Sequence, residues 1–404
     1  MKYIVVLGDG MADYPITALG NLTPLQYART PNLDRLAAAG QLGMVKTVPE
    51  GMPPGSDVAN LSVMGYDPRL YYTGRSPLEA VAMGVELEDT DVAFRCNLVT
   101  LSEESDYATK TMIDYSSDEI SSEESAQLIE EVKNRLGSSE IKFYPGISYR
   151  HLMVWQNGAL DVNLTPPHDI SERKINDHLP RGPHSEILLR LMVESSRFLP
   201  SHPVNQARVN RGLRPATSLW FWGQGIKPAL PSFNDKFGLT GSVISAVDLT
   251  KGLGICAGLK AVKVPGATGN ITTNFIGKAR AAIAELEQGR DFVYVHVEAP
   301  DEAGHRGELD TKVKSIEEID EKVIGLLLEE LEPFEDYRLM ILPDHPTPLS
   351  VRTHTGEEVP FLIYQKSQPV QGSKNGYNEE SAKNSGNYVA EGHQLMDYFL
   401  RGHP

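Results

Sequence analysis

The sequence predicts an α/β protein in which helices flank a mostly parallel sheet, with a smaller α+β domain inserted into it. Apolar runs at residues 3–7, 292–297 and 338–342 have the unbroken hydrophobic character of strands that are buried on both faces. Residues 312–331 lie between the last two runs and carry apolar side chains at helical spacing. A strand, a helix and a strand in that order are typical of a parallel sheet covered by helices.

Two further segments extend this core. Helical spacing continues over residues 25–39, where Leu33, Leu36 and Ala37 share one side. The apolar run at residues 243–247 predicts a fourth strand.

The middle of the chain has a different pattern. Residues 93–101 and 141–155 resemble strands, and Ser121 with Glu124 forms a capping box for a helix that ends near residue 136. Residues 164–183 carry four prolines and few core side chains, which is typical of a connector.

This change of pattern indicates an insertion. We predict a core of residues 1–90 and 180–404, which resumes with a helix near Ser185. Residues 91–179 are predicted to form the inserted domain.

The composition narrows the possible partners. A net charge of −16 and a pI of about 5.2 argue against nucleic-acid binding, but a local cationic pocket can still hold a small phosphorylated substrate. The two cysteines, Cys96 and Cys256, are predicted to be buried free thiols, which fits a reducing compartment. The first apolar run is too short for a signal peptide, and no run of about 18 apolar residues occurs. We expect a cytoplasmic protein without a membrane partner; the sequence leaves the oligomeric state open.

Acidic and imidazole side chains follow three of the predicted strands. Asp9 comes after the first strand, Asp301 and His305 after the second, and Asp344, His345 and His354 after the third. The carboxyl ends of strands form the ligand crevice of open α/β sheets, so these six side chains are expected to gather there. A single Asp after a strand is usually a turn former, and the prediction depends on the repetition.

Three neighbouring carboxylates repel one another and cannot all stay ionised without cations. Mixed Asp and His ligands suit zinc or manganese better than magnesium or calcium. Two such ions about 4 Å apart can stabilise both the attacking and the leaving oxygen of a phosphoryl transfer. Ser56 lies in a Pro/Gly-rich turn that enters a helix, where it is either a plain N-cap or a nucleophile beside an anion site.

Motifs that recur in a known family lie in collinear order along nearly the whole chain. They include Gly8-Asp9-Gly10, Gly55-Ser56-Asp57, Gly65-Tyr66-Asp67-Pro68, Asp301-Glu302-Ala303-Gly304-His305, Asp344-His345-Pro346-Thr347-Pro348 and Thr353-His354-Thr355. With these motifs the chain resembles the archaeal-type 2,3-bisphosphoglycerate-independent phosphoglycerate mutases, a family of the alkaline phosphatase superfamily. The resemblance implies a metal-binding, alkaline-phosphatase-like core, an inserted domain that covers the substrate, and an isomerase of glycolysis that converts 3-phosphoglycerate into 2-phosphoglycerate. It implies a phosphoserine intermediate and two divalent metal ions, without a nucleotide or 2,3-bisphosphoglycerate.

The resemblance also implies roles for single residues. Ser56 would be phosphorylated transiently. One metal would be held by Asp9, Ser56, Asp344 and His345, and the other by Asp301, His305 and His354. Asp57, Arg150, Arg208 and Lys278 would bind substrate, whereas His168, His296 and His393 are predicted to be structural.

Two positions depart from the family pattern. Asp118 and Glu119 stand near a place where many members have a cation, and Trp222 replaces an arginine. This variant is similar to a bacterial branch proposed to contain homoserine kinases, so phosphoryl transfer to an amino-acid hydroxyl is one alternative, although the chain has no Walker motif. A metal-dependent phosphomonoesterase or phosphonate hydrolase is another. A binding protein without catalysis is disfavoured because the set of metal and nucleophile positions is complete.

Overall fold

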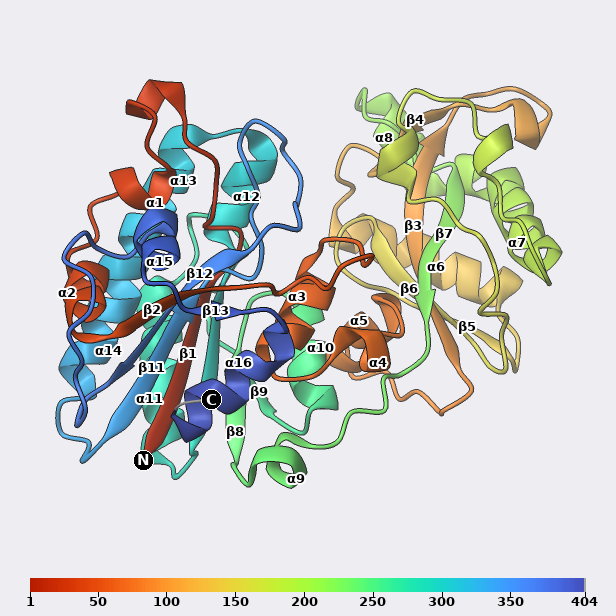
Figure 1. Ribbon diagram of the computed structural model, residues 1–404. Helices are drawn as coiled ribbons and strands as arrows, with labels where there is room; N and C mark the ends of the chain where they lie inside the picture. Colours follow the sequence, from red (N-terminus) through yellow and green to blue (C-terminus); the bar gives the residue numbers. More distant parts are fainter. Residues whose placement is uncertain (403–404) are drawn as a thin grey trace. The chain divides into compact units, whose positions relative to one another are not determined.

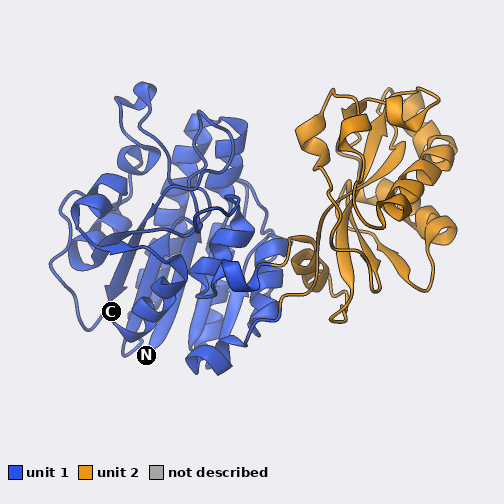
Figure 2. Cartoon of the chain, turned by 45° about the vertical axis from the view of Figure 1, so that its right-hand side comes forward, with its two compact units in different colours: residues 1–72, 229–404 blue, residues 73–228 orange. Residues whose placement is uncertain are grey.

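The computed structural model describes residues 1–402, which divide into two compact units (Figure 2). Unit 1 contains residues 1–72 and the chain from residue 229 onward, and unit 2 is Thr73–Pro228.

Unit 1 is built on a sheet in which most neighbouring strands are parallel (Figure 1). Its strands are, in spatial order, β13 (Tyr388–Val389), β2 (Gln41–Val45), β12 (Val359–Gln365), β11 (Tyr337–Leu342), β1 (Lys2–Gly8), β10 (Phe292–Val297), β8 (Gly241–Ile244) and β9 (Lys260–Val262). Strand β12 is antiparallel to both of its neighbours. Leu7 of β1 is in register with His296 of β10 and Leu342 of β11, so these three parallel strands end at the same level.

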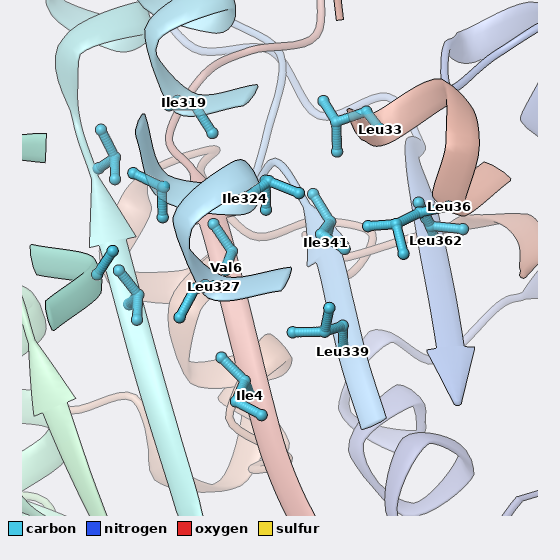
Figure 3. Packing of buried hydrophobic residues seen from close by; sticks show 14 of the residues in the cluster. Ile4, Val6, Leu33, Leu36, Ile319, Ile324, Leu327, Leu339, Ile341 and Leu362 are labelled. Atoms are coloured by element: carbon cyan, nitrogen blue, oxygen red, sulfur yellow. The ribbon is translucent and has the colours of Figure 1, made fainter. Parts of the chain in front are cut away.

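Helices cover both faces of this sheet, because successive side chains of a buried strand point to opposite sides. Ile4 and Val6 of β1 face a core shared with helices α2, α11, α13 and α14 (Figure 3). Tyr3 points the other way and its ring lies edge-on to Phe399 of α16. Each fully buried aliphatic side chain of this kind contributes about 1.5–3 kcal/mol.

The α-helices of unit 1 are α1 (Pro24–Tyr27), α2 (Pro31–Ala39), α3 (Ser56–Val63), α4 (Pro68–Tyr71), α9 (Phe233–Phe237), α10 (Asp248–Cys256), α11 (Phe275–Glu287), α12 (Ala299–Arg306), α13 (Leu309–Glu318), α14 (Gly325–Glu330), α15 (Glu379–Asn384) and α16 (Leu395–Arg401). The predicted helix at 25–39 is interrupted before Pro31, which begins α2 and cannot continue a preceding helix. The helix predicted at 312–331 forms as α13 and α14 joined by the π-helical segment Ile319–Ile324.

Unit 2 is an α+β unit with its own core. Its antiparallel sheet has β3 (Val92–Leu101), β4 (Met112–Asp114), β5 (Ile141–Tyr144), β6 (Arg150–Trp155) and β7 (Ser218–Gly225), with β3 paired to β4, β6 and β7. Its α-helices are α5 (Ser76–Ala82), α6 (Ser122–Leu136), α7 (Ser185–Phe198) and α8 (Pro203–Asn210).

The inserted unit is longer than the sequence predicts at both ends. The prediction was residues 91–179, whereas the compact unit is Thr73–Pro228. The helix that begins at Ser185 does not resume the core, because Leu188, Leu191 and Met192 of α7 pack into the hydrophobic cluster of unit 2. Strand β7 also pairs with β3, which draws the following residues into this unit.

The predicted fold class is confirmed: an α/β core with a mostly parallel sheet flanked by helices, and a smaller α+β unit inserted into it. No helix within residues 1–402 combines the length and the apolar character that a bilayer crossing requires.

Candidate active site

Loops after three adjacent parallel strands bring the predicted acidic and imidazole side chains together. Asp9 follows β1, Asp344 follows β11, and Asp301 lies in the first turn of α12, just after β10. The loop after β1 turns at Gly10, where φ is +63° and a Cβ atom would lie 2.8 Å from Asp301 Oδ1. Glycine is therefore required there by both the backbone conformation and the close approach of Asp301.

Asp9 is buried beside other carboxylates. Burial, followed by the charges of Asp344 and Asp301, raises the pKa of Asp9 well above its usual value. Its Oδ1 atom is buried and has no hydrogen-bond partner among residues 1–402. A buried carboxylate oxygen without a donor is costly unless a cation binds it.

His296 bonds the other oxygen of Asp9. Its Nε2 atom lies 3.0 Å from Asp9 Oδ2, and its Nδ1 atom lies 3.0 Å from Ser245 Oγ. Burial lowers the pKa of His296 to about 3, so the ring is neutral and carries one N–H. We assign that proton to Nε2, because the Asp9 carboxylate can only accept and the Ser245 hydroxyl can donate to Nδ1.

Asp344 is fully buried and its carboxylate has donors on both oxygens. Oδ1 accepts from the backbone N–H groups of Gly10 (3.2 Å) and His345 (3.0 Å), and Oδ2 accepts from Asn60 Nδ2 (2.8 Å). His345 Nε2 lies 3.3 Å from Asp344 Oδ2 and 3.6 Å from Asp9 Oδ1. Burial lowers the pKa of His345, which favours the neutral imidazole that can bind a metal.

Asp301, His305 and His354 form a second group. His305 Nε2 is 3.3 Å and His354 Nε2 is 3.4 Å from the Asp301 carboxylate. Although burial acts in the opposite direction, the two imidazoles lower the pKa of Asp301 well below its usual value. The hydrogen bond to Asp301 raises the pKa of His305 to about 9.

Ser56 is the first residue of α3 and lies next to the first group. Its Oγ atom is 3.1 Å from His345 Nε2. The free N–H groups of a helix start favour an anion at this position.

These residues fit divalent metal ions. Ligand atoms of Asp301, His305 and His354 lie within 4.8 Å of one another, and the same holds for Asp9, Asp301 and His345 and for Asp9, His296 and Asp344. The unpartnered oxygen of Asp9 and the crowding of carboxylates are both relieved by cations. The structure thus holds candidate metal-binding groups, and the roles of their members stay predictions.

Two of the four predicted substrate-binding residues belong to unit 1. Asp57 follows Ser56 and accepts a hydrogen bond from the Tyr72 hydroxyl at 2.7 Å. Lys278 of α11 is fully buried and donates to the carbonyl of His296 at 2.8 Å. Burial lowers the pKa of Lys278 to about 8, although the charges of Glu298 and Asp9 oppose this shift.

The other two belong to unit 2 and differ in exposure. Arg150 begins β6 and is exposed, and its guanidinium carbon lies 5.2 Å from the ring centre of Tyr149. Arg208 is 2% exposed, and its guanidinium bonds Glu124, the carbonyl of Ser117 and the carbonyl of Arg214. The structure therefore commits the Arg208 side chain to contacts within unit 2.

A cationic cluster in unit 2 was not predicted. Glu79 faces Arg75 at 3.1 Å and Arg95 at 3.3 Å, and the charge of Arg150 also acts on it. Burial lowers the pKa of Arg95 to about 10. Three arginines around one carboxylate leave a net positive charge that favours an anion. The sequence signal for this cluster was Arg95, a charged residue within the otherwise mostly apolar run 92–101.

The structure shows which groups contact Trp222 and the turn at Asp118 and Glu119, the two departures from the family pattern. The Trp222 ring lies 4.5 Å from the Arg95 guanidinium carbon, and its indole N–H donates to Asn97 at 3.0 Å. Ser117, Asp118 and Glu119 all have positive φ, and the Asp114 carboxylate holds this turn by accepting from Ser116 and Asp118. Trp222 therefore stacks on the guanidinium of Arg95.

The fold and these side chains define the class, an α/β protein with a candidate two-metal centre and an adjacent serine at a helix start. A family model described as 2,3-bisphosphoglycerate-independent phosphoglycerate mutase matches residues 37–205. A probable 2,3-bisphosphoglycerate-independent phosphoglycerate mutase of Geobacter sulfurreducens is 53% identical over 99% of this chain and 100% of its own length. The corresponding mutase of Methanothrix thermoacetophila is 50% identical over the full length of both chains.

Solved structures agree with this relationship. The PH0037 protein from Pyrococcus horikoshii has a TM-score of 0.83 and 30% identity, and 99% of this chain and 96% of that chain are covered. The cofactor-independent phosphoglycerate mutase from Thermoplasma acidophilum has a TM-score of 0.67 and 25% identity, with 99% of both chains covered. The chain belongs to the family of 2,3-bisphosphoglycerate-independent phosphoglycerate mutases, and the resemblance found in the sequence is confirmed.

Proposed function

We propose that this protein is an isomerase that interconverts 3-phosphoglycerate and 2-phosphoglycerate through phosphorylated Ser56, without 2,3-bisphosphoglycerate or a nucleotide. The observation that carries the proposal is the 3.1 Å separation of Ser56 Oγ from His345 Nε2, within a chain whose full-length relatives are named as such mutases. A cytoplasmic location would fit an enzyme of glycolysis, and it stays a prediction.

The chain's own groups account for the steps. Ser56 Oγ attacks the phosphorus of 3-phosphoglycerate, the bond from phosphorus to the 3-oxygen breaks, and the Ser56 hydroxyl proton passes to that oxygen, so that phosphoserine and glycerate form. The 2-hydroxyl of glycerate then attacks the phosphoserine, the bond from phosphorus to Ser56 Oγ breaks, and the proton of the 2-hydroxyl returns to Ser56 Oγ as 2-phosphoglycerate is released. Backbone N–H groups at the start of α3 bind the phosphoryl oxygens throughout.

We propose two metal ions at the candidate centre. Asp9, Ser56, Asp344 and His345 would hold one, and Asp301, His305 and His354 the other. When bound, the ions would stabilise the Ser56 alkoxide and neutralise phosphoryl charge. The mixture of carboxylate and imidazole ligands favours manganese or zinc.

The remaining predicted residues would bind the substrate. Lys278 bonds the carbonyl of His296, whose ring contacts Asp9, and Asp57 directly follows Ser56 in the chain. Arg150 and the neighbouring Arg75 and Arg95 give unit 2 a cationic site suited to the carboxylate of phosphoglycerate. Arg208 is proposed to bind substrate on the resemblance alone.

An enolase-coupled assay tests the function. Metal-reconstituted protein receives 3-phosphoglycerate without 2,3-bisphosphoglycerate or nucleotide. We expect turnover that stops after chelation and is lost in Ser56→Ala. Full activity of Ser56→Ala would contradict the phosphoserine mechanism.

The same preparation separates the alternatives. Net release of phosphate from several phosphate esters would indicate a phosphatase. Consumption of ATP only when homoserine is present would indicate a kinase. A mutase shows neither and converts phosphoglycerate alone.

A further inference from the structure

Asn60 links the nucleophile to a predicted metal ligand. It lies one turn after Ser56 in α3 and is fully buried. Its Nδ2 atom donates to the backbone carbonyl of Ser56 at 2.8 Å and to Asp344 Oδ2 at 2.8 Å. One amide group thus contacts the residue that would be phosphorylated and the strand-end carboxylate opposite it.

Tyr294 sets the orientation of this amide. Its hydroxyl lies 2.7 Å from Asn60 Oδ1, and its side chain is fully buried in β10. Burial raises the pKa of Tyr294 well above its usual value, so the hydroxyl keeps its proton and donates. With the amide oxygen facing this donor, both amide N–H groups must face the two acceptors.

The location of Tyr294 makes this arrangement rigid. Tyr294 and His296 point to the same side of β10, and His296 bonds Asp9. Strand β10 therefore orients both carboxylates of the first predicted metal group, directly through His296 and through Asn60 for Asp344.

We infer that Asn60, held by Tyr294, is a positioning residue that fixes Asp344 relative to Ser56 and so sets the affinity of one of two metal sites. The inference rests on the proposed function for its catalytic consequence, but the contacts themselves lie between protein groups. Partners that orient metal ligands typically change metal affinity 10–100-fold when they are removed. The second group, Asp301, His305 and His354, makes no hydrogen bond with Asn60 and provides an internal reference.

The test variants separate positioning from stability. Asn60→Leu removes the amide but leaves the Tyr294 hydroxyl buried without an acceptor. The double variant Asn60→Leu/Tyr294→Phe removes both partners, which restores much of the stability lost in the single variant. Tyr294→Phe alone keeps the two donors of Asn60 and frees their orientation.

Asn205→Leu is the matched control. Asn205 is also a fully buried amide with three hydrogen bonds, at 2.7, 2.7 and 2.8 Å, and it lies in unit 2. Its substitution should lower stability without changing metal affinity.

Titration of metal-free protein with Mn²⁺, followed by calorimetry, gives the affinity of each site without substrate. We expect the double variant to bind Mn²⁺ 10–100-fold more weakly at one site and normally at the other, and Tyr294→Phe to lose at least threefold at that same site. In the coupled assay kcat should fall at least tenfold while KM changes little.

Wild-type affinity at both sites in the folded double variant would overturn the inference. If the Asn60 variants do not fold, unchanged affinity in Tyr294→Phe overturns it. Wild-type protein that binds two Mn²⁺ but does not convert phosphoglycerate would refute the proposed function, while the affinity comparison would still decide the role of Asn60.

Discussion

The Nε2 atoms of His305 and His354 lie 3.0 Å apart, and both face the carboxylate of Asp301. His305 Nδ1 lies 3.1 Å from the carbonyl oxygen of Arg352, so Nδ1 carries a proton that is donated to this carbonyl. In the neutral ring Nε2 then keeps its lone pair. Arg352 has a φ angle of +60°, a backbone conformation that residues other than glycine rarely adopt. The backbone that orients His305 is thus itself unusual, as is common where strain serves a site.

This relationship predicts the effect of His305→Ala. Loss of one of three ligands should remove about one bound metal ion per chain, because Asp301 and His354 alone hold it weakly. Metal content after gel filtration, measured by mass spectrometry, checks this. His393→Ala is the control, since His393 is near Glu391 and outside the candidate groups. An unchanged metal content in His305→Ala would remove His305 from the ligand set.

Buried Lys312 predicts a large effect on stability. Its ammonium group donates to Asp13 Oδ2 at 2.8 Å, to the carbonyl of Thr347 at 2.8 Å and to that of Ala12 at 3.3 Å. It therefore ties the loop after β1 to the loop after β11. Lys312→Met leaves a buried carboxylate without its partner and should cost about 3–5 kcal/mol in the free energy of unfolding.

Urea unfolding followed by circular dichroism measures this loss. Lys314→Met on the same helix is the control, because Lys314 is exposed and its pair with Glu318 is expected to contribute about 0–1 kcal/mol. Equal losses in the two variants would contradict a special role for Lys312.

The core of the fold was predictable because its signals are local. The apolar runs that became β1, β10 and β11 are buried on both faces, and a strand of that kind is recognisable from its own residues. The limits of unit 2 were not predictable in this way. Strand β7 belongs there because it pairs with β3, more than a hundred residues earlier, and packs into the hydrophobic cluster of unit 2, and the pairing has no local signature.

The candidate site also combines residues that local sequence signals predict with contacts that depend on strand pairing. The six side chains that follow strands lie together, as expected from the rule that ligands gather at the carboxyl ends of a parallel sheet. His296 was predicted to be structural. Its contact with Asp9 depends on the register of β10 against β1, which sequence periodicity does not reveal.

His151 predicts part of the pH dependence of unit 2. It is 2% exposed, and burial lowers its pKa from 6.5 to about 3. Below pH 6.5 the unfolded chain therefore binds a proton at His151 that the folded chain does not bind. The free energy of unfolding is then at its full value above pH 6.5 and decreases as the pH falls toward 3. At pH 5 the loss should be about 2 kcal/mol.

His151→Asn should remove this loss, since asparagine does not titrate and can still accept from the Gly146 N–H. All three tryptophans, Trp155, Trp220 and Trp222, lie in unit 2, so their fluorescence during urea unfolding reports on this unit. The free energy of unfolding at pH 7 and pH 5 is compared, with exposed His184→Asn as the control. A variant with the full wild-type decrease would contradict the prediction.

Arg150 and Arg208 are expected to respond differently to substitution, because one side chain is exposed and the other is committed to the protein. Arg150→Ala should raise KM for 3-phosphoglycerate about tenfold or more with little change in the melting temperature, since it removes a cation beside the Arg75 and Arg95 cluster. Arg150→Lys should restore part of the affinity, because it keeps the charge without the planar fork. Arg208→Ala should instead lower the melting temperature, as it leaves the carbonyls of Ser117 and Arg214 without the Arg208 donor. Exposed Arg135→Ala on α6 should change neither quantity. An unchanged KM in Arg150→Ala would exclude Arg150 from substrate binding, and a raised KM with normal stability in Arg208→Ala would show that Arg208 leaves its protein partners to bind the substrate.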